Sequence, residues 1–140
     1  MATIYRSVTV HLSAEDLWTR VADVGQISDL LDIVHKSSVS GDTRSCTLAD
    51  GGQLTETIVG IDEEHQRVAY TITDSPFPIE FHAASMQVID EGNGTSTLVW
   101  ITDVKPDAMA DGLGPMIEGN LDALGRRFGG QHCIQARHAR

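Results

Sequence analysis

The chain has 140 residues, of which 41% are hydrophobic and 21% are charged, values typical of one globular domain. Ten basic against twenty acidic residues give a net charge of −10 with neutral histidines, and such a field opposes binding to nucleic acid or to anionic membranes. No apolar run approaches the roughly 18 residues of a membrane helix, and the first ten residues do not resemble a signal peptide. We therefore expect one domain over residues 1–140, located in the cytoplasm, with no nucleic-acid and no membrane partner.

The first predicted element is a strand over residues 4–12, in which Ile4, Val8 and Val10 share one face. Ser13 then begins SAEDLW, where an N-cap residue is followed three residues later by an acid. This pattern predicts a helix that ends near Gly25. Residues 26–31 are compatible with a second short helix.

From Ile33 onward the apolar residues alternate for about seventy residues, and turn signals divide this stretch into about six strands. After Pro106 the apolar period becomes helical, with one stripe formed by Met109, Leu113, Met116, Ile117, Leu121, Leu124 and Phe128. The expected order is one strand, two short helices, six strands and a long helix over about residues 107–130.

Five strings in this order carry a family resemblance: VTVHLSAEDLW, GGQLTETIVGID, RVAYTI, PFPIEFHA and NGTSTLVW. Together they resemble the START-like (SRPBCC) superfamily, and within it the polyketide cyclase/dehydrase branch. That superfamily also includes the birch-pollen allergen and the plant abscisic-acid receptors. The resemblance implies an α+β helix-grip fold, in which a curved antiparallel sheet of about seven strands surrounds a long C-terminal helix and encloses a small-molecule cavity. Because one fold hosts many activities, the function has to be argued from the cavity residues.

Glu56 is the first candidate for such a cavity residue. It lies between Leu54 and Ile58 on the same strand face, and a buried carboxylate has to be paired or hydrogen-bonded. The resemblance implies that this position faces the ligand. A structural salt bridge to Arg6, the charged residue on the inner face of the first strand, is the alternative.

Two histidines are further candidates. His35 shares parity with Ile33 and Val39, which predicts an inward imidazole, either as a cavity group or as a satisfied core residue. The strand of His82 is partly apolar on both faces, so periodicity does not orient it. The resemblance places His82 at a ligand-facing position, four residues after Pro78, where an imidazole could act as general acid/base. A packing or surface role is the alternative.

Parity and the resemblance together predict a set of ligand-contacting residues, which are Arg6, Tyr70, Ile72, Phe77, Met86, Trp100, Met116 and Asn120. A buried Asn120 amide needs hydrogen-bond partners, and Glu56 is one candidate. Phe77 belongs to a Pro-Phe-Pro turn that the resemblance equates with a gating loop. The inner lysine with which the plant receptors meet a ligand carboxylate is absent, and Asp32 stands near its position.

Neither a metal nor a cofactor is expected, since the sequence contains no HExxH, CxxC, P-loop, GxSxG or GxGxxG motif. The two cysteines, Cys46 and Cys133, lack metal-ligand spacing. In a cytosolic chain we expect them to be free thiols.

Two functions fit these residues. The first is a cyclase or dehydratase, a lyase that closes rings by aldol-type chemistry in an apolar, carbonyl-bearing molecule such as a polyketide. His82 would move the proton, Glu56 with Asn120 would orient the reactants, and His35 or Arg6 would polarise the enolate oxygen. The alternative is a non-catalytic carrier or sensor that uses the same side chains as hydrogen-bond anchors for a hydrophobic ligand. A homodimer and a role in modulating a partner protein stay open.

Overall fold

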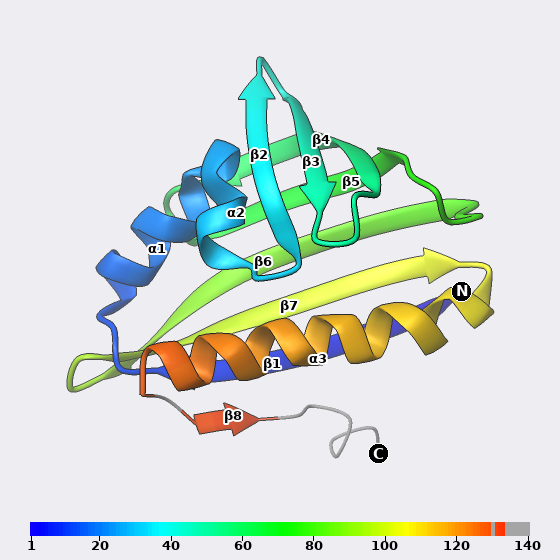
Figure 1. Cartoon of the computed structure of the whole chain (residues 1–140). Helices are drawn as coiled ribbons and strands as arrows, with labels where there is room; N and C mark the ends of the chain where they lie inside the picture. Colours follow the sequence, from blue (N-terminus) through cyan, green and yellow to red (C-terminus); the bar gives the residue numbers. More distant parts are fainter. Residues whose placement is uncertain (130, 134–140) are drawn as a thin grey trace.

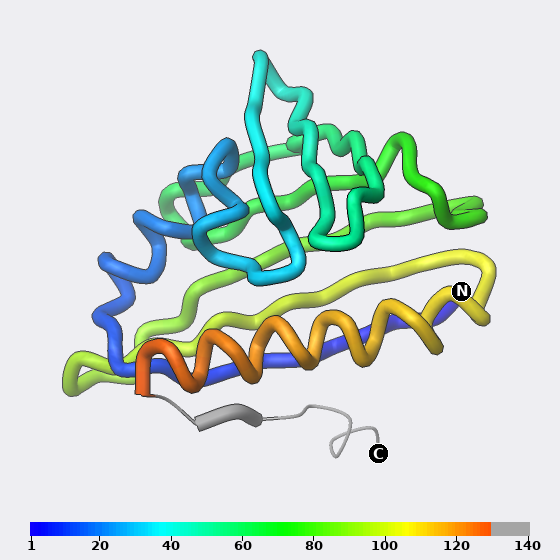
Figure 2. The backbone as a smooth tube through the Cα atoms, in the orientation of Figure 1, coloured from blue at the N-terminus to red at the C-terminus, as the bar shows by residue number. Residues whose placement is uncertain are grey.

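An antiparallel sheet organises the chain in the computed structural model, which describes residues 1–129 and the backbone of residues 131–133. The strand order is β2-β3-β4-β5-β6-β7-β1-β8. The strands are β1 (Ala2–Val10), β2 (Val34–Ser40), β3 (Thr43–Leu48), β4 (Gln53–Asp62), β5 (Arg67–Asp74), β6 (Phe81–Gly92), β7 (Thr95–Lys105) and β8 (Gln131–Cys133). The six alternating segments therefore form a meander from β2 to β7. The sheet then continues with β1, which pairs with β7 (Figures 1 and 2).

Two short helices follow β1, as predicted. Helix α1 (Ala14–Ala22) begins after Ser13, whose Oγ accepts the backbone N–H of Asp16 at 3.1 Å. A 3-10 turn η1 (Val24–Gln26) and helix α2 (Ile27–Leu30) complete the connection to β2. Helix α1 buries Leu17, Trp18 and Val21, which are the apolar residues at helical spacing.

The long C-terminal helix α3 (Ala110–Arg127) follows a 3-10 turn η2 (Asp107–Met109) and lies along β1 (Figure 1). It buries Leu113, Ile117, Leu121 and Leu124 against the inner face of the sheet. These apolar side chains drive the packing, because removing them from water outweighs the weak helix propensity of the glycines in α3. The helix-grip fold predicted from the sequence is thus confirmed.

Along each strand, successive side chains point alternately to the inner face of the sheet, which packs against α3, and to the outer face, which points away from it. Val8, Val88 and Leu98 lie opposite one another on neighbouring strands, and all three are buried on the inner face. No helix in the described part of the chain is long and apolar enough to cross a membrane.

Candidate functional site

A cavity lies between the inner face of the sheet, helix α3 and the segment around α2. The centre of a water-sized sphere can occupy about 50 Å³ of it, room for roughly three to five waters at about 10–15 Å³ each. Most of its wall is apolar, and its polar side chains are Arg44, Cys46, Glu56, Tyr70, His82 and Thr102. Of the predicted site residues, the structure places eight in this wall: Glu56, Tyr70, Ile72, Phe77, His82, Met86, Trp100 and Met116.

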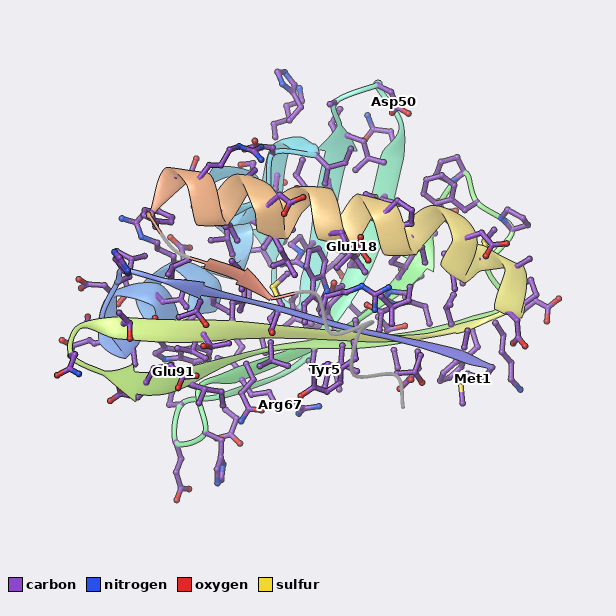
Figure 3. The ribbon with its side chains drawn as sticks, turned by 90° about the horizontal axis from the view of Figure 1, so that it is seen from below. Met1, Tyr5, Asp50, Arg67, Glu91 and Glu118 are labelled. Carbon is purple, nitrogen blue, oxygen red and sulfur yellow. The ribbon has the colours of Figure 1, made fainter. Side chains whose placement is uncertain are left out.

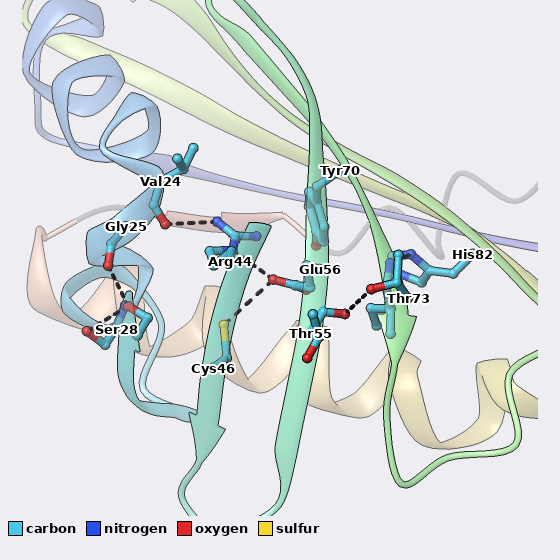
Figure 4. Close-up of polar contacts among 12 residues, drawn as sticks. Val24, Gly25, Ser28, Arg44, Cys46, Thr55, Glu56, Tyr70, Thr73 and His82 are labelled. Carbon is cyan, nitrogen blue, oxygen red and sulfur yellow. Dashed lines mark hydrogen bonds and ion pairs between the residues drawn. The ribbon is translucent and has the colours of Figure 1, made fainter. Parts of the chain in front are cut away.

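The register of the sheet brings the central residues of the cavity into one row. Glu56 on β4 lies opposite Arg44 on β3 and opposite Ile72 on β5. His82 on β6 comes next, because its imidazole binds the backbone of Ile72. Side chains from four neighbouring strands therefore meet on one line across the concave face (Figure 4).

Glu56 forms a buried ion pair with Arg44. The Arg44 Nε donates to Glu56 Oε1 at 2.7 Å, and the two side chains are only 4% and 7% exposed. Arg44 Nη1 also donates to the carbonyl of Val24 at 3.2 Å, which connects the η1 turn to the sheet. A buried charge is tolerated when it is paired and hydrogen-bonded in this way. The carboxylate is held at one oxygen, and Oε2 has no hydrogen-bond partner among the described residues.

The thiol of Cys46 donates to the same Glu56 oxygen at 3.6 Å. Burial, followed by the nearby Glu56 carboxylate, raises the pKa of Cys46 to about 12. The thiolate is the reactive form of cysteine, so this buried free thiol is an unreactive one.

Tyr70 presents a hydroxyl group with an unused proton. Its oxygen accepts the indole N–H of Trp100 at 2.9 Å, and the guanidinium of Arg44 lies 5.1 Å from the centre of its ring. Burial, with the Glu56 carboxylate nearby, raises the pKa of Tyr70, so the phenol keeps its proton at neutral pH. Within the described residues this proton has no acceptor, which leaves it free to donate to a bound molecule.

His82 points inward, which resolves the orientation that periodicity left open. Its Nδ1 accepts the backbone N–H of Ile72 at 3.0 Å, and its ring is 5.8 Å from that of Tyr70. Burial lowers the pKa of His82 from 6.5 to about 4, so the ring is neutral near pH 7. With Nδ1 acting as acceptor, the single ring proton sits on Nε2. In this arrangement His82 offers a hydrogen-bond donor, and the lone pair that a general base needs is already engaged.

The predicted partner of Glu56 was wrong. Arg6 does face inward, but its Nε donates to Glu118 Oε2 on α3 at 2.6 Å, and it does not line the cavity. The reason is topological, since three strands separate β1 from β4 in the sheet. Arg6 and Glu118 instead join the first strand to the long helix.

His35 was also wrongly predicted to point inward. Its side chain is exposed, because the pairing of β2 with β3 shifts between Val34 and Lys36. The shift makes His35 an extra residue in a bulge, and a bulge breaks the alternation on which the prediction relied. After it, Ser37 is the residue that turns toward the short helices, where its Oγ donates to the carbonyl of Gly25 at 2.9 Å.

Asn120 is buried as predicted, but its partners differ from the expected Glu56. Its Oδ1 accepts the backbone N–H of Ile33 at 3.1 Å, and its Nδ2 donates to the carbonyl of Met116 at 2.9 Å. The side chain borders a neighbouring hollow with Asp32 and Gly119. Asn120 therefore fixes the segment that leads into β2.

Sequence reasoning missed Arg44 as a site residue. In TRSCTL, Arg44 lies on the same strand face as Cys46 and Leu48, which are buried on the inner face of the sheet. The same parity test that selected Glu56 would have selected this arginine. Among the described residues, no group of three His, Cys, Asp or Glu side chains is arranged to hold a metal ion.

The family of polyketide cyclase / dehydrase and lipid transport proteins matches residues 1–129. A protein from Thermobifida fusca, solved by NMR, is 31% identical, with a TM-score of 0.77 over 92% of this chain and 94% of that chain. XoxI from Bacillus cereus is 23% identical, with a TM-score of 0.85 over 91% and 96% of the two chains.

A more distant structure of the same fold is norcoclaurine synthase from Thalictrum flavum, solved with dopamine and hydroxybenzaldehyde. It is 19% identical, with a TM-score of 0.64 over 90% of this chain and 87% of that chain. No curated protein matches the chain. The match over residues 1–129 and the helix-grip fold lead to one conclusion: the chain belongs to the polyketide cyclase / dehydrase and lipid transport family.

Proposed function

We propose that the cavity binds an apolar small molecule through a carbonyl oxygen, and that the protein catalyses aldol-type ring closure and dehydration in such molecules. One observation carries the proposal: two neutral donors, the Tyr70 O–H and the His82 Nε2–H, belong to neighbouring side chains in a mostly apolar wall. Both side chains are buried, and each has its acceptor atom occupied by another group of the protein. Such donors favour a ligand atom that accepts hydrogen bonds.

The same two donors suit the chemistry of a carbonyl group. When a proton leaves the carbon next to a carbonyl, negative charge develops on the oxygen. Fixed donors in a dry site stabilise that charge more than they stabilise the ground state. A neutral imidazole can act in this way without transferring its own proton. His82 then serves as an electrophile, a different role from the acid/base that its sequence position predicted.

Glu56 is the group that we assign to proton transfer. Its Oε2 takes the α-proton, and the resulting enolate carbon attacks a second carbonyl carbon of the same molecule, forming a carbon–carbon bond. The new alkoxide takes the proton back from Glu56. Loss of that hydroxyl group with another α-proton releases water. The sequence of steps neither consumes nor releases electrons, so it needs no external oxidant or reductant.

A carrier or sensor is the second candidate. It is favoured by the ion pair with Arg44, which already holds one oxygen of the only carboxylate in the cavity wall, among the described residues. In that case Tyr70 and His82 anchor a carbonyl oxygen and no bond changes. Norcoclaurine synthase, solved with an aromatic aldehyde, indicates that the fold can hold a carbonyl compound.

The test uses a linear diketone whose carbonyls are separated by three methylene groups, because its ring closure yields a conjugated cyclohexenone that is followed by absorbance. We expect the wild-type protein to accelerate this reaction and Glu56→Gln to lower the rate by about 10²–10⁴-fold. Binding of the saturated cyclic ketone, measured by calorimetry, should change far less. Binding without turnover in the wild type would reject the enzyme and support the carrier. Absence of both would reject the proposed ligand class.

A further inference from the structure

The outer face of the sheet, which the cavity does not use, carries several exposed apolar side chains. Tyr5, Val59, Phe81 and Ile89 are 45%, 66%, 46% and 40% exposed. Between them lies a shallow hollow lined by small residues that include Ala69, Ala83 and Ser85. Figure 3 shows this side of the sheet, with Tyr5 and Arg67 directed away from α3 and its Glu118. Apolar groups collected around a hollow are typical of an interaction surface.

The strand register shows how these residues are arranged. Ser85 on β6 lies opposite Ala69 on β5 and Ile101 on β7, and Ile101 lies opposite Tyr5 on β1. On the β4 side, Gly60 lies opposite Ala69, and the preceding residue, Val59, ends this central row. Along β6 itself, Phe81 and Ile89 lie on either side of Ser85. The four exposed apolar residues therefore form a cross centred on Ser85.

The arms of this cross differ in length by only a few ångströms. Neighbouring strands are about 4.8 Å apart, so Val59 and Tyr5 lie roughly 10 Å from the centre. Two residues along a strand span about 6.8 Å. Phe81 and Ile89 are each four residues from Ser85, so they lie roughly 14 Å from this central residue. If a second copy packs its outer face against this one with its strands nearly at right angles, the central row of each copy lies over the β6 strand of the other.

We propose that this face binds a second copy of the same chain by an isologous contact centred on Ser85, with the two β6 strands crossing nearly at right angles. Orthogonal crossing is one of the two common ways in which sheets pack face to face. Val59 then meets the partner's Phe81, and Tyr5 meets the partner's Ile89. The small side chains at the centre let the two sheets approach closely.

Charge complementarity selects a second copy over an unrelated apolar partner. Arg67 on β5 and Asp103 on β7 lie at opposite corners of the cross, since they pair with Gln87 and Ala83 on β6. The two-fold axis that brings Val59 to the partner's Phe81 also brings Arg67 to the partner's Asp103.

A second charged contact obeys the same symmetry. Lys105 lies opposite Phe81, and Asp62 lies opposite Arg67. The axis brings Lys105 to the partner's Asp62. Each ion pair occurs twice in an isologous dimer, and each joins opposite charges.

The test is sedimentation velocity of the full chain at about 0.15 M salt, where exposed charges are screened beyond about 8 Å. We expect a concentration-dependent dimer for the wild type. Arg67→Asp and Asp103→Arg should each weaken it by about tenfold or more, because each places like charges together. Lys36→Asp makes the same change in net charge as Arg67→Asp, but on the exposed part of β2, and it should leave the dimer unchanged.

Mixing the two single variants is the decisive experiment. In a heterodimer of Arg67→Asp with Asp103→Arg, both contacts between positions 67 and 103 again join opposite charges, so the mixture should dimerise more tightly than either variant alone. A wild type that stays monomeric up to about 10⁻⁴ M, a regime of weak contacts, would overturn the proposal. It would also fail if Lys36→Asp disrupted the dimer equally or if mixing restored nothing.

Discussion

Nδ1 of His82 accepts the backbone N–H of Ile72 at 3.0 Å, so a side chain joins β5 to β6 at this point. The backbone ladder between these strands extends from Arg67 to Tyr70 and stops at the pair Tyr70–Ala84. Two residue pairs further on, where Ile72 lies beside His82, the imidazole takes the place of a backbone carbonyl as acceptor, which satisfies a buried donor. Protonation of Nδ1 would remove this acceptor, so a charged ring and the joined strands exclude each other.

The first prediction concerns stability in acid. The unfolded chain binds a proton at His82 near pH 6.5, whereas the folded protein does so only near pH 4. The contribution of the neutral ring to stability is therefore complete above pH 6.5 and is lost as the pH falls toward 4. The loss should amount to about 3 kcal/mol at most. Urea unfolding of the wild type and of His82→Asn, which keeps an acceptor but does not titrate, measures the difference.

The unfolding free energies of the wild type and His82→Asn should converge as the pH falls, relative to their difference at pH 7. His35→Asn removes an exposed imidazole and should follow the wild type throughout. Parallel curves for the wild type and His82→Asn would contradict a buried neutral ring.

The second prediction concerns the buried ion pair. Arg44→Met and Glu56→Leu should each cost about 3–5 kcal/mol, because each leaves one charge buried without its partner. The double variant should cost much less than the sum. The matched control is Arg6→Met with Glu118→Leu, since those side chains are 17% and 29% exposed. The coupling between them should be about 1 kcal/mol or less. Equal coupling free energies in the double-mutant cycles of the two ion pairs would show that burial is not what makes the Arg44–Glu56 pair strong.

The sequence predicted the elements well, because alternation and helical spacing repeat over many residues. It failed where one local irregularity or one long-range pairing decided the outcome. The bulge after Val34 turned His35 outward, which no parity argument detects. His82 is inward because it lies opposite Val104, a fully buried residue, and that register is set by the whole β6–β7 hairpin. The partner of Glu56 follows from the β3–β4 pairing and not from its own strand.

The third prediction tests the phenol donor. Tyr70→Phe keeps the ring but removes the O–H, and it should lower turnover of the diketone by about 10²–10³-fold if that proton stabilises the developing oxyanion. Trp100→Phe removes the indole N–H that holds the oxygen, so its effect on turnover should be smaller. Melting temperatures serve as the control for folding. Loss of binding in Tyr70→Phe in proportion to turnover would favour the carrier.

The fourth prediction concerns the thiol of Cys46. Since burial raises its pKa to about 12, iodoacetamide at pH 8 should modify Cys46 in the native protein only when the site opens. Glu56→Gln removes the carboxylate that helps to raise this pKa, so modification should become faster. Timed alkylation followed by peptide mass spectrometry measures both rates. Rapid labelling of native wild-type Cys46 would contradict its burial.

The outermost strands of the described sheet have a consequence for self-association. On one side β8 contributes three residues beside β1, and on the other β2 carries a bulge and the exposed Lys36. Short, irregular and charged edges are poor templates for the addition of a strand from another chain. Edge-to-edge growth into fibrils is therefore disfavoured at both ends of the sheet, and contact between copies is directed to a closed, face-to-face pair.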